Sequence, residues 1–203
     1  MSKKIGIFSG TFDPVHEGHV AFAKAALTEG GLDRVFFMVE PRPRRKQGVK
    51  ALQHRQEMVK RAIAHEPGLA SLIVDQNRFT VSHTLPLLQA RFKSQELYFL
   101  MGDDFFEHLA HWPHVRELIE SVTFAIGLRK QRVDNVKTHI VAMEKTRGLK
   151  FHYVTFKAAN SDYNSRNIRL ALKRGHAPEG LNSSVLRYIK QHHLYEPTAI
   201  EPR

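Results

Sequence analysis

Cysteine is absent from the 203 residues of the chain. This absence excludes disulfides, thiolate catalysis and cysteine-ligated zinc. It also fits a reducing cytoplasm, where we expect the protein to act. Long apolar runs are missing as well: stretches such as Val35–Val39 are far shorter than the roughly 20 residues of a membrane-spanning helix, so we expect no membrane partner. Ser2-Lys3-Lys4 does not open a signal peptide, because Ser9-Gly10 interrupts the apolar stretch after it.

Acidic residues are scarce relative to basic ones. The chain has 20 Asp and Glu against 31 Lys and Arg, a net charge of +11, which favours polyanionic ligands such as nucleotides, nucleic acid or an anionic surface. Its hydrophobic content of 42% and charged content of 25% are typical of globular proteins. No internal repeat, low-complexity tract or linker interrupts the chain. We therefore predict a single domain over residues 1–196 and a disordered tail at 197–203.

Apolar runs typical of strands alternate with stretches of helical periodicity. The predicted strands are Ile5–Phe8, Val35–Val39, Leu72–Val74, Leu97–Met101, Val122–Leu128 and Phe151–Phe156. Predicted helices cover roughly residues 19–28, 51–65, 82–93, 104–120 and 138–147, and two more close the chain at about 165–174 and 182–192. This alternation predicts an α/β fold with a Rossmann-like, doubly wound parallel sheet and a small C-terminal helical segment.

In the second predicted helix, Leu52, Val59 and Ile63 mark the buried face. The same periodicity predicts that Arg55 faces outward.

The turn between the first strand and the first helix reads Gly10-Thr11-Phe12-Asp13-Pro14-Val15-His16-Glu17-Gly18-His19. Open α/β sheets bind ligands at such turns, and a helix N-terminus adds N–H donors and a positive dipole. His16 and His19 are three residues apart, so they share one helical face and suit the phosphates of a nucleotide. A metal site is the alternative, but no cysteine or nearby carboxylate pair completes its ligand set. The turn fits neither GxGxxG nor a P-loop.

A basic loop follows the second predicted strand. It runs Glu40-Pro41-Arg42-Pro43-Arg44-Arg45-Lys46-Gln47-Gly48-Val49-Lys50. It leaves the carboxyl end of a strand beside the histidine turn, which favours phosphate binding over a merely solvated basic loop.

Three later segments bring polar or aromatic groups to the ends of strands. Thr80 to Ser82 supply hydroxyls before a helix, where capping by Thr80 or Ser82 is an equally good explanation. Gly102-Asp103-Asp104 follows a strand, where carboxylates commonly accept hydrogen bonds from ribose or cap a helix. Trp112 is the only tryptophan, and it either packs in the core or stacks on a flat ring.

Near the C-terminus, Asn164-Ser165 precedes a predicted helix and either residue would cap it. Arg166 and Arg169 share a face at the start of this helix. Cations there oppose the helix dipole, and a bound anion would reverse that penalty. We therefore predict a second phosphate-binding position here.

The string Gly-Thr-Phe-Asp-Pro-x-His-x-Gly-His resembles the signature of the HxGH nucleotidyltransferases. The order of the other motifs, from Ile5 to about Tyr195, is similar to that of the bacterial-type nicotinate-mononucleotide adenylyltransferases. This resemblance implies transfer of AMP from ATP to nicotinate mononucleotide, giving nicotinate adenine dinucleotide and pyrophosphate in NAD biosynthesis. It implies Mg²⁺ carried with ATP, and no dedicated metal site on the protein.

The resemblance also assigns roles to individual residues. The catalytic residues would be His16, His19, Lys46 and Arg169. ATP would be bound by Ser9, Gly10, Thr11, Phe12, Gly18, Gly102, Asp104, Ser165 and Ile168. The acceptor would be bound by Glu40, Arg45, Thr80, Val81, Ser82 and Trp112.

Four motifs depart from the family pattern. Pro43-Arg44-Arg45-Lys46 replaces Pro-Pro-His-Lys/Arg, and Phe79–Leu85 carries Ser-Tyr-Thr-x-x-Thr-Leu one residue out of register. Tyr163–Arg169 replaces Ile-Ser-Ser/Ala-Thr-x-Ile-Arg, and Glu40 stands where an Asn is common.

Two alternatives therefore stay open. One is a sister transferase that acts on another phosphorylated acceptor, such as phosphopantetheine. The other is a non-catalytic, basic nucleotide- or RNA-binding protein, although the chain has no obvious platform of stacking aromatics.

Overall fold

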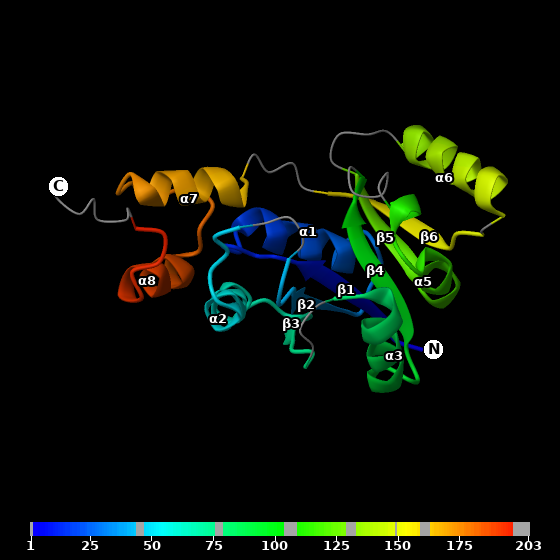
Figure 1. Cartoon of the computed structure of the whole chain (residues 1–203), viewed down its shortest axis with the longest axis horizontal. Helices are drawn as coiled ribbons and strands as arrows, with labels where there is room; N and C mark the ends of the chain where they lie inside the picture. Colours follow the sequence, from blue (N-terminus) through cyan, green and yellow to red (C-terminus); the bar gives the residue numbers. More distant parts are fainter. Residues whose placement is uncertain are drawn as a thin grey trace.

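The computed structural model describes residues 2–43, 47–75, 79–103, 109–128, 133–148, 150–158 and 163–196. Its centre is a parallel sheet of six strands in the order β3-β2-β1-β4-β5-β6 (Figure 1). The strands are β1 (Lys4–Gly10), β2 (Arg34–Val39), β3 (Leu69–Leu72), β4 (Glu96–Gly102), β5 (Thr123–Leu128) and β6 (Tyr153–Lys157). The strand order reverses between β1 and β4, which makes this the switch point where such sheets bind ligands. The predicted α/β class is confirmed.

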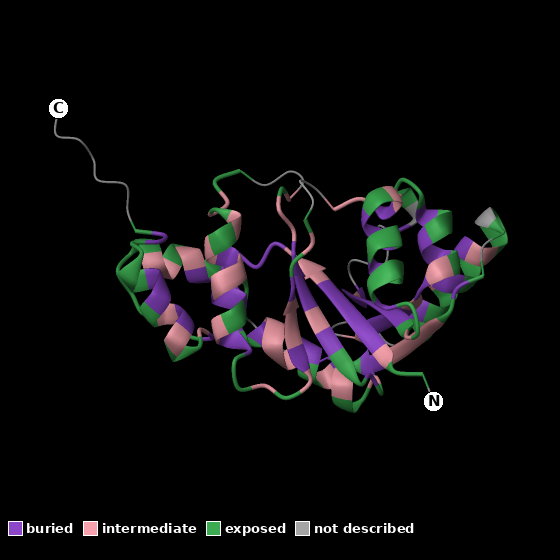
Figure 2. Cartoon of the chain, turned by 90° about the horizontal axis from the view of Figure 1, so that it is seen from below, coloured by how far each residue is buried: buried purple, intermediate pink, exposed green. Residues whose placement is uncertain are grey.

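Helices cover both faces of this sheet. They are α1 (Glu17–Thr28), α2 (Leu52–Ala62), α3 (Val81–Arg91), the short 3₁₀ helix η1 (Leu109–His111), α5 (Val115–Ser121), α6 (Val133–Arg147), α7 (Ser165–Lys173) and α8 (Ser183–Gln191). One hydrophobic core packs α1, α2 and α8 on one face, and a second packs α3, α5 and α6 on the other. Figure 2 shows the strands buried between helices whose outer surfaces are exposed.

The sequence of β1 explains why the sheet is covered on both faces. Successive strand side chains point to opposite faces, so Ile5 and Ile7 join one core while Phe8 joins the other. Helix α1 packs closely over β5 because position 127 is a glycine: a Cβ there would overlap the ring of Phe22. The N-terminus of α1 is thereby held at the carboxyl edge of the sheet.

Three predicted elements differ from the structure. The helix expected at about 138–147 is longer, because α6 begins at Val133. The third strand was expected at Leu72–Val74 but lies at Leu69–Leu72, and Ile73 beyond it is 53% exposed. The single helix expected over 104–120 is wrong, because η1 and α5 are separated around His114, whose φ of 59° is left-handed. The tail at 197–203 lies outside the described residues, so its predicted disorder stays a prediction.

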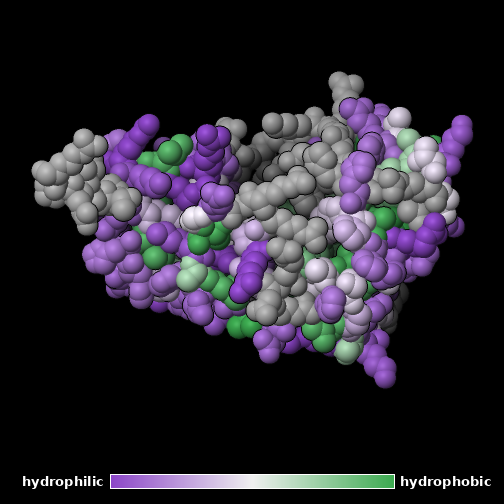
Figure 3. All heavy atoms as spheres, in the orientation of Figure 1, coloured by the Kyte–Doolittle hydropathy of each residue, from purple (hydrophilic) through white to green (hydrophobic). Residues whose placement is uncertain are grey.

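The face of the molecule seen in Figure 1 is largely polar where the structure describes it. Figure 3 shows hydrophilic side chains over much of the described surface on this face, with smaller apolar areas among them. Among the helices that the structure describes, none is both long and apolar enough to cross a membrane.

Candidate active site

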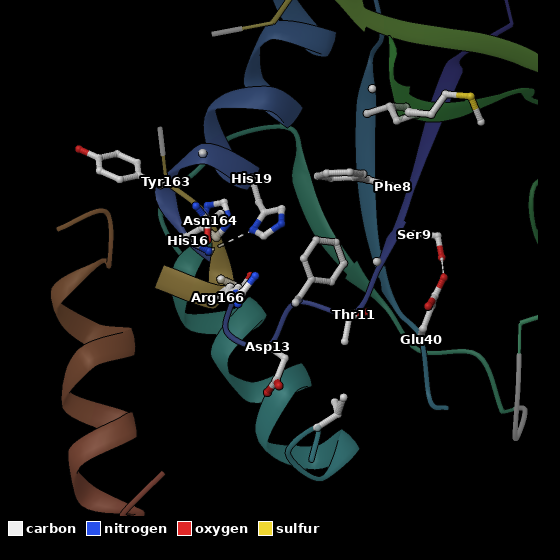
Figure 4. A pocket seen from close by; sticks show the side chains of 18 of the residues that line it. Phe8, Ser9, Thr11, Asp13, His16, His19, Glu40, Tyr163, Asn164 and Arg166 are labelled. Carbon is white, nitrogen blue, oxygen red and sulfur yellow. Dashed lines mark hydrogen bonds between the residues drawn. The ribbon is translucent and has the colours of Figure 1, made fainter. Parts of the chain in front are cut away.

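A cavity of about 690 Å³ opens at the carboxyl ends of β1 and β4. The β1–α1 turn forms one side, the start of α7 another, and residues of the loop after β2 complete the wall. Figure 4 shows the labelled side chains of these segments around the opening. A cavity therefore lies at the position that the strand order predicts for a ligand.

Most of the sequence-predicted site residues meet in this cavity. It is lined by Ser9, Gly10, Thr11, Phe12, His16, Gly18, His19, Gly102, Ser165 and Arg169 from the predicted catalytic and ATP-binding sets, and by Glu40 and Trp112 from the acceptor set. Arg166, which we placed beside Arg169, lines it as well.

Several predicted residues lie elsewhere. Thr80, Val81 and Ser82 are not among the lining residues, and Val81, the first residue of α3, is buried in the core. Ile168 is 3% exposed on the inner face of α7 and does not reach the cavity. Lys46, Arg45 and Asp104 fall outside the described residues, so their predicted roles stay predictions.

The two histidines sit together at the start of α1. Their ring centroids are 3.6 Å apart, and the backbone N–H of His16 donates to Nδ1 of His19 at 3.2 Å. A neutral imidazole has one N–H and one acceptor nitrogen. His19 in its neutral form therefore carries its proton on Nε2, which is a hydrogen-bond donor.

Asp13 is the centre of a hydrogen-bonded cluster beneath this turn. It is buried, and its Oδ1 accepts from the Tyr195 hydroxyl at 2.5 Å and from the Lys50 N–H at 3.3 Å. Its carbonyl oxygen accepts from Nη1 of Arg169 at 2.7 Å. Burial, and then the Asp13 carboxylate, raise the pKa of Tyr195, so the hydroxyl keeps its proton and acts as the donor.

Arg55 lies on the other side of the same cluster. It is 1% exposed, so the prediction that it faces outward is wrong. Its guanidinium donates to the carbonyl oxygens of Lys50, Thr11, Glu40 and Pro41 at 2.8–2.9 Å. Burial lowers the pKa of Arg55, and the nearby carboxylates of Asp13 and Glu40 offset this shift only in part. Three of the four acceptors are backbone atoms 14 to 44 residues away, and helical periodicity cannot reveal them.

The start of α7 is joined to the same turn. Asn164 caps the helix by accepting from the Asn167 N–H at 2.8 Å, which confirms the predicted cap. Ser165 instead donates its hydroxyl proton to the Pro14 carbonyl at 3.0 Å. Arg166 and Arg169 therefore stand at a helix N-terminus that faces the cavity.

Trp112 has both of the environments considered for it. Its ring is half-buried and meets Phe99 and Phe79 edge-on, with centroids 6.2 and 6.4 Å apart. It also lines the cavity. One part of the ring therefore packs on the core while the side chain borders the ligand space.

Among the described residues, no group of three or more His, Cys, Asp or Glu could hold an ion. The Asp13 carboxylate is buried and accepts two hydrogen bonds.

Comparison with known proteins places this fold and site in a class of nucleotide-transferring enzymes. Residues 7–171 match the family model described as cytidylyltransferase-like. The chain is 31% identical over 200 residues to a probable nicotinate-nucleotide adenylyltransferase of Bacillus pumilus, covering 96% of this chain and 99% of that one. It is 38% identical over 133 residues to the Bacillus subtilis nicotinate-nucleotide adenylyltransferase, covering 63% and 70% of the two chains. The chain therefore belongs to the cytidylyltransferase-like family and, within it, to the nicotinate-nucleotide adenylyltransferases.

A solved structure shares the fold. A Plasmodium falciparum nicotinic acid mononucleotide adenylyltransferase complexed with NaAD matches with a TM-score of 0.77 at 15% identity, covering 95% of this chain and 97% of that one. At this identity the similarity supports the fold, and the activity must be argued from the site.

Proposed function

We propose that the chain is an adenylyltransferase that moves AMP from ATP to nicotinate mononucleotide, giving nicotinate adenine dinucleotide and pyrophosphate. The observation that carries this proposal is the meeting of three features in one cavity: the His16–His19 turn, the arginines of α7, and Trp112. The first two suit phosphates and the third suits a flat ring. The names of the relatives agree with this reaction.

The reaction needs positioning and charge stabilisation more than acid–base chemistry. A phosphate monoester is largely dianionic near neutral pH, so an acceptor oxygen can attack the α-phosphorus of ATP without a general base. The new bond joins this oxygen to the α-phosphorus, and the bond from that phosphorus to the bridging oxygen of the β-phosphate breaks. Pyrophosphate leaves with the electron pair.

Charge builds on the non-bridging and leaving oxygens during this step. The Nε2–H of His19 and the guanidinium of Arg169 are donors that the fold holds at the cavity wall. Fixed donors stabilise developing charge without reorganisation, which is the source of most such rate gains. Lys46 would add a further cation from the basic loop.

Magnesium would arrive with ATP, as the resemblance to the family implies. When bound, it would neutralise phosphate charge. We place the enzyme in the cytoplasm, as the cysteine-free sequence led us to expect.

The acceptor rests on fewer contacts than ATP does. Trp112 and Glu40 line the cavity, whereas the segment from Thr80 to Ser82, from which we expected contacts with the acceptor, does not. The preference for nicotinate over nicotinamide mononucleotide is therefore supported chiefly by the relatives. A sister transferase remains the second candidate, because Glu40 stands where the family commonly has Asn.

An adenylation assay across a panel of acceptors tests the proposal. Purified protein, ATP and Mg²⁺ are incubated with nicotinate mononucleotide, nicotinamide mononucleotide or 4′-phosphopantetheine, and pyrophosphate release is measured. We expect the highest kcat/KM with nicotinate mononucleotide. Turnover of phosphopantetheine alone would identify the sister transferase, and no turnover with any acceptor would refute the enzyme.

A further inference from the structure

Arg55 contacts both sides of the proposed acceptor–ATP junction without lining the cavity itself. Its Nη1 donates to the Thr11 carbonyl in the β1–α1 turn at 2.9 Å and to the Glu40 carbonyl after β2 at 2.8 Å. One nitrogen thus bridges the segment that leads to the histidines and the segment that begins the basic loop.

The remaining nitrogens hold both described ends of that loop. Nη2 donates to the Pro41 carbonyl at 2.9 Å and Nε to the Lys50 carbonyl at 2.8 Å. Gln47 and Val49, which lie between these two ends in sequence, line the cavity. A single planar guanidinium therefore fixes the base of a loop whose residues border the ligand space.

The charge of Arg55 is balanced within the same cluster. The carboxylates of Asp13 and Glu40 both interact electrostatically with it, and Asp13 also accepts from the Lys50 N–H. Arg55 is the largest side chain among those with under 2% exposure. A buried charge is costly unless it is paired and fully hydrogen-bonded. The packing of α2 does not by itself require a cation at position 55, because an apolar side chain would fill the same volume.

We propose that Arg55 is a positioning residue: it holds the β1–α1 turn and the loop after β2 in register, and this alignment determines the rate of nucleotidyl transfer rather than the affinity for ATP. The inference rests on the proposed function, because the two segments are those assigned to ATP and to the acceptor. In-line transfer is sensitive to such alignment, and a misplacement of about 1 Å can cost on the order of 100-fold in rate.

The test is Arg55→Lys, with Arg61→Lys as the matched control. Lysine keeps the positive charge beside Asp13 but lacks the planar guanidinium group. It therefore cannot donate hydrogen bonds to all four carbonyl oxygens in their present positions. Arg61 lies on the same helix but is partly exposed, and its partners are Glu57 and the ring of Tyr188, away from the cavity. For both variants we would measure the thermal transition, the Kd for ATP, and kcat per folded molecule.

We expect Arg55→Lys to fold, to bind ATP within about threefold of the wild type, and to lose roughly 100-fold in kcat. Arg61→Lys should match the wild type in the Kd for ATP and in kcat. A kcat within about threefold of the wild type for Arg55→Lys would overturn the proposal, as would a parallel loss of ATP affinity and kcat. A near-normal kcat would show that the alignment does not depend on the guanidinium group of Arg55. A parallel loss of ATP affinity and kcat would show that Arg55 supports the fold in general.

Should Arg55→Lys fail to fold, the double variant Asp13→Asn/Arg55→Met would be compared with Asp13→Asn alone. Removing both charges together avoids leaving one buried without its partner. A kcat lower than that of Asp13→Asn, with equal ATP affinity, supports the proposal. Equal kcat, or failure of the double variant to fold, overturns it.

The wild type is measured first with the acceptor panel, which separates this inference from the proposed function. If another phosphorylated acceptor replaces nicotinate mononucleotide, the choice of acceptor fails and the Arg55 comparison is made with the acceptor that works. A wild-type protein that adenylates none of them refutes both.

Discussion

At the scale of single residues, the two histidines have different tasks. Nδ1 of His19 is occupied by the His16 N–H, so only the opposite edge of its ring can donate toward a ligand. His16 is the residue that precedes α1, and its ring lies against that of His19. The pair therefore both shapes the turn and supplies donors. A substitution can separate these two tasks.

We expect His19→Asn to keep the turn and lose the reaction. The asparagine oxygen can take the place of Nδ1 as the acceptor for His16, but no group replaces Nε2–H. Losing one fixed donor at developing charge costs about 10²–10³-fold in kcat. Pyrophosphate release is the readout, with His54→Asn as the control because His54 contacts Tyr188 on α8 rather than the cavity. Near-normal turnover by folded His19→Asn would show that the Nε2–H is not a catalytic donor.

Trp112 allows the acceptor side to be tested alone. If it stacks on the pyridine ring, Trp112→Ala should raise the acceptor KM about 2- to 12-fold and leave the KM for ATP nearly unchanged, because such stacking contributes roughly 0.5–1.5 kcal/mol. Trp112→Phe should retain most of the affinity. Since this is the only tryptophan, its fluorescence should also change on addition of nicotinate mononucleotide without ATP. If both substrates are affected together with a loss of roughly 3–5 kcal/mol in stability, the ring only packs.

At the scale of elements, α7 and the β1–α1 turn act as one unit. Arg169 donates to the Asp13 carbonyl, and Ser165 donates to the Pro14 carbonyl. The N-terminus of α7 is therefore held at a fixed place beside the histidines. Arg169 can use one guanidinium edge for the turn and keep other N–H donors for phosphate.

We expect Arg169→Ala to weaken ATP and pyrophosphate binding together. Arg169→Lys should recover only part of the affinity, because a point charge lacks the bidentate fork. Lys173→Ala removes the same charge from the exposed side of α7 and is the control. Titrations of ATP and of pyrophosphate provide the measurement. Coincident ATP curves for the wild type and Arg169→Ala would assign Arg169 to the turn alone.

The elements also show what the sequence can predict. Strand and helix types follow from local periodicity, and the Asn164 cap follows from local hydrogen-bonding chemistry. The third strand was misplaced because the apolar run continues to Ile73 and Val74 after sheet pairing ends at Leu72. The helix expected over 104–120 was wrong because the left-handed backbone at His114 interrupts it.

The candidate site was predictable only in part, for a related reason. The histidine turn and the start of α7 are contiguous motifs, so their chemistry can be read directly from the chain. Arg55 has no such motif, because three of its four acceptors come from Thr11, Glu40 and Pro41, which lie 14 to 44 residues away. A charged residue on a helix is most often exposed, and only the assembled fold reveals this exception.

At the scale of the whole molecule, the end of the described chain returns to its beginning. Tyr195 donates to Asp13 across 182 positions of sequence, and the Glu17 N–H at the start of α1 donates to the Gly180 carbonyl before α8. The Tyr195 ring is buried, with Nζ of Lys50 5.5 Å from its centroid. The C-terminal segment therefore stabilises the histidine turn through these contacts. We accordingly expect substitutions in these contacts to change both stability and activity.

Tyr195→Phe tests this dependence with the loss of one oxygen atom. The ring can stay in place, but the buried Asp13 carboxylate loses a donor, and a hydrogen bond to a charged group contributes about 1.5–3 kcal/mol. For a protein of this length we expect Tm to fall by roughly 3–12 °C. The matched control is Tyr188→Phe, which removes the contact of that hydroxyl with Nδ1 of His54, 2.9 Å away, between α2 and α8. Calorimetry of both variants decides the question: a Tm loss for Tyr195→Phe no larger than for Tyr188→Phe would mean that the C-terminal segment does not support the turn through Asp13.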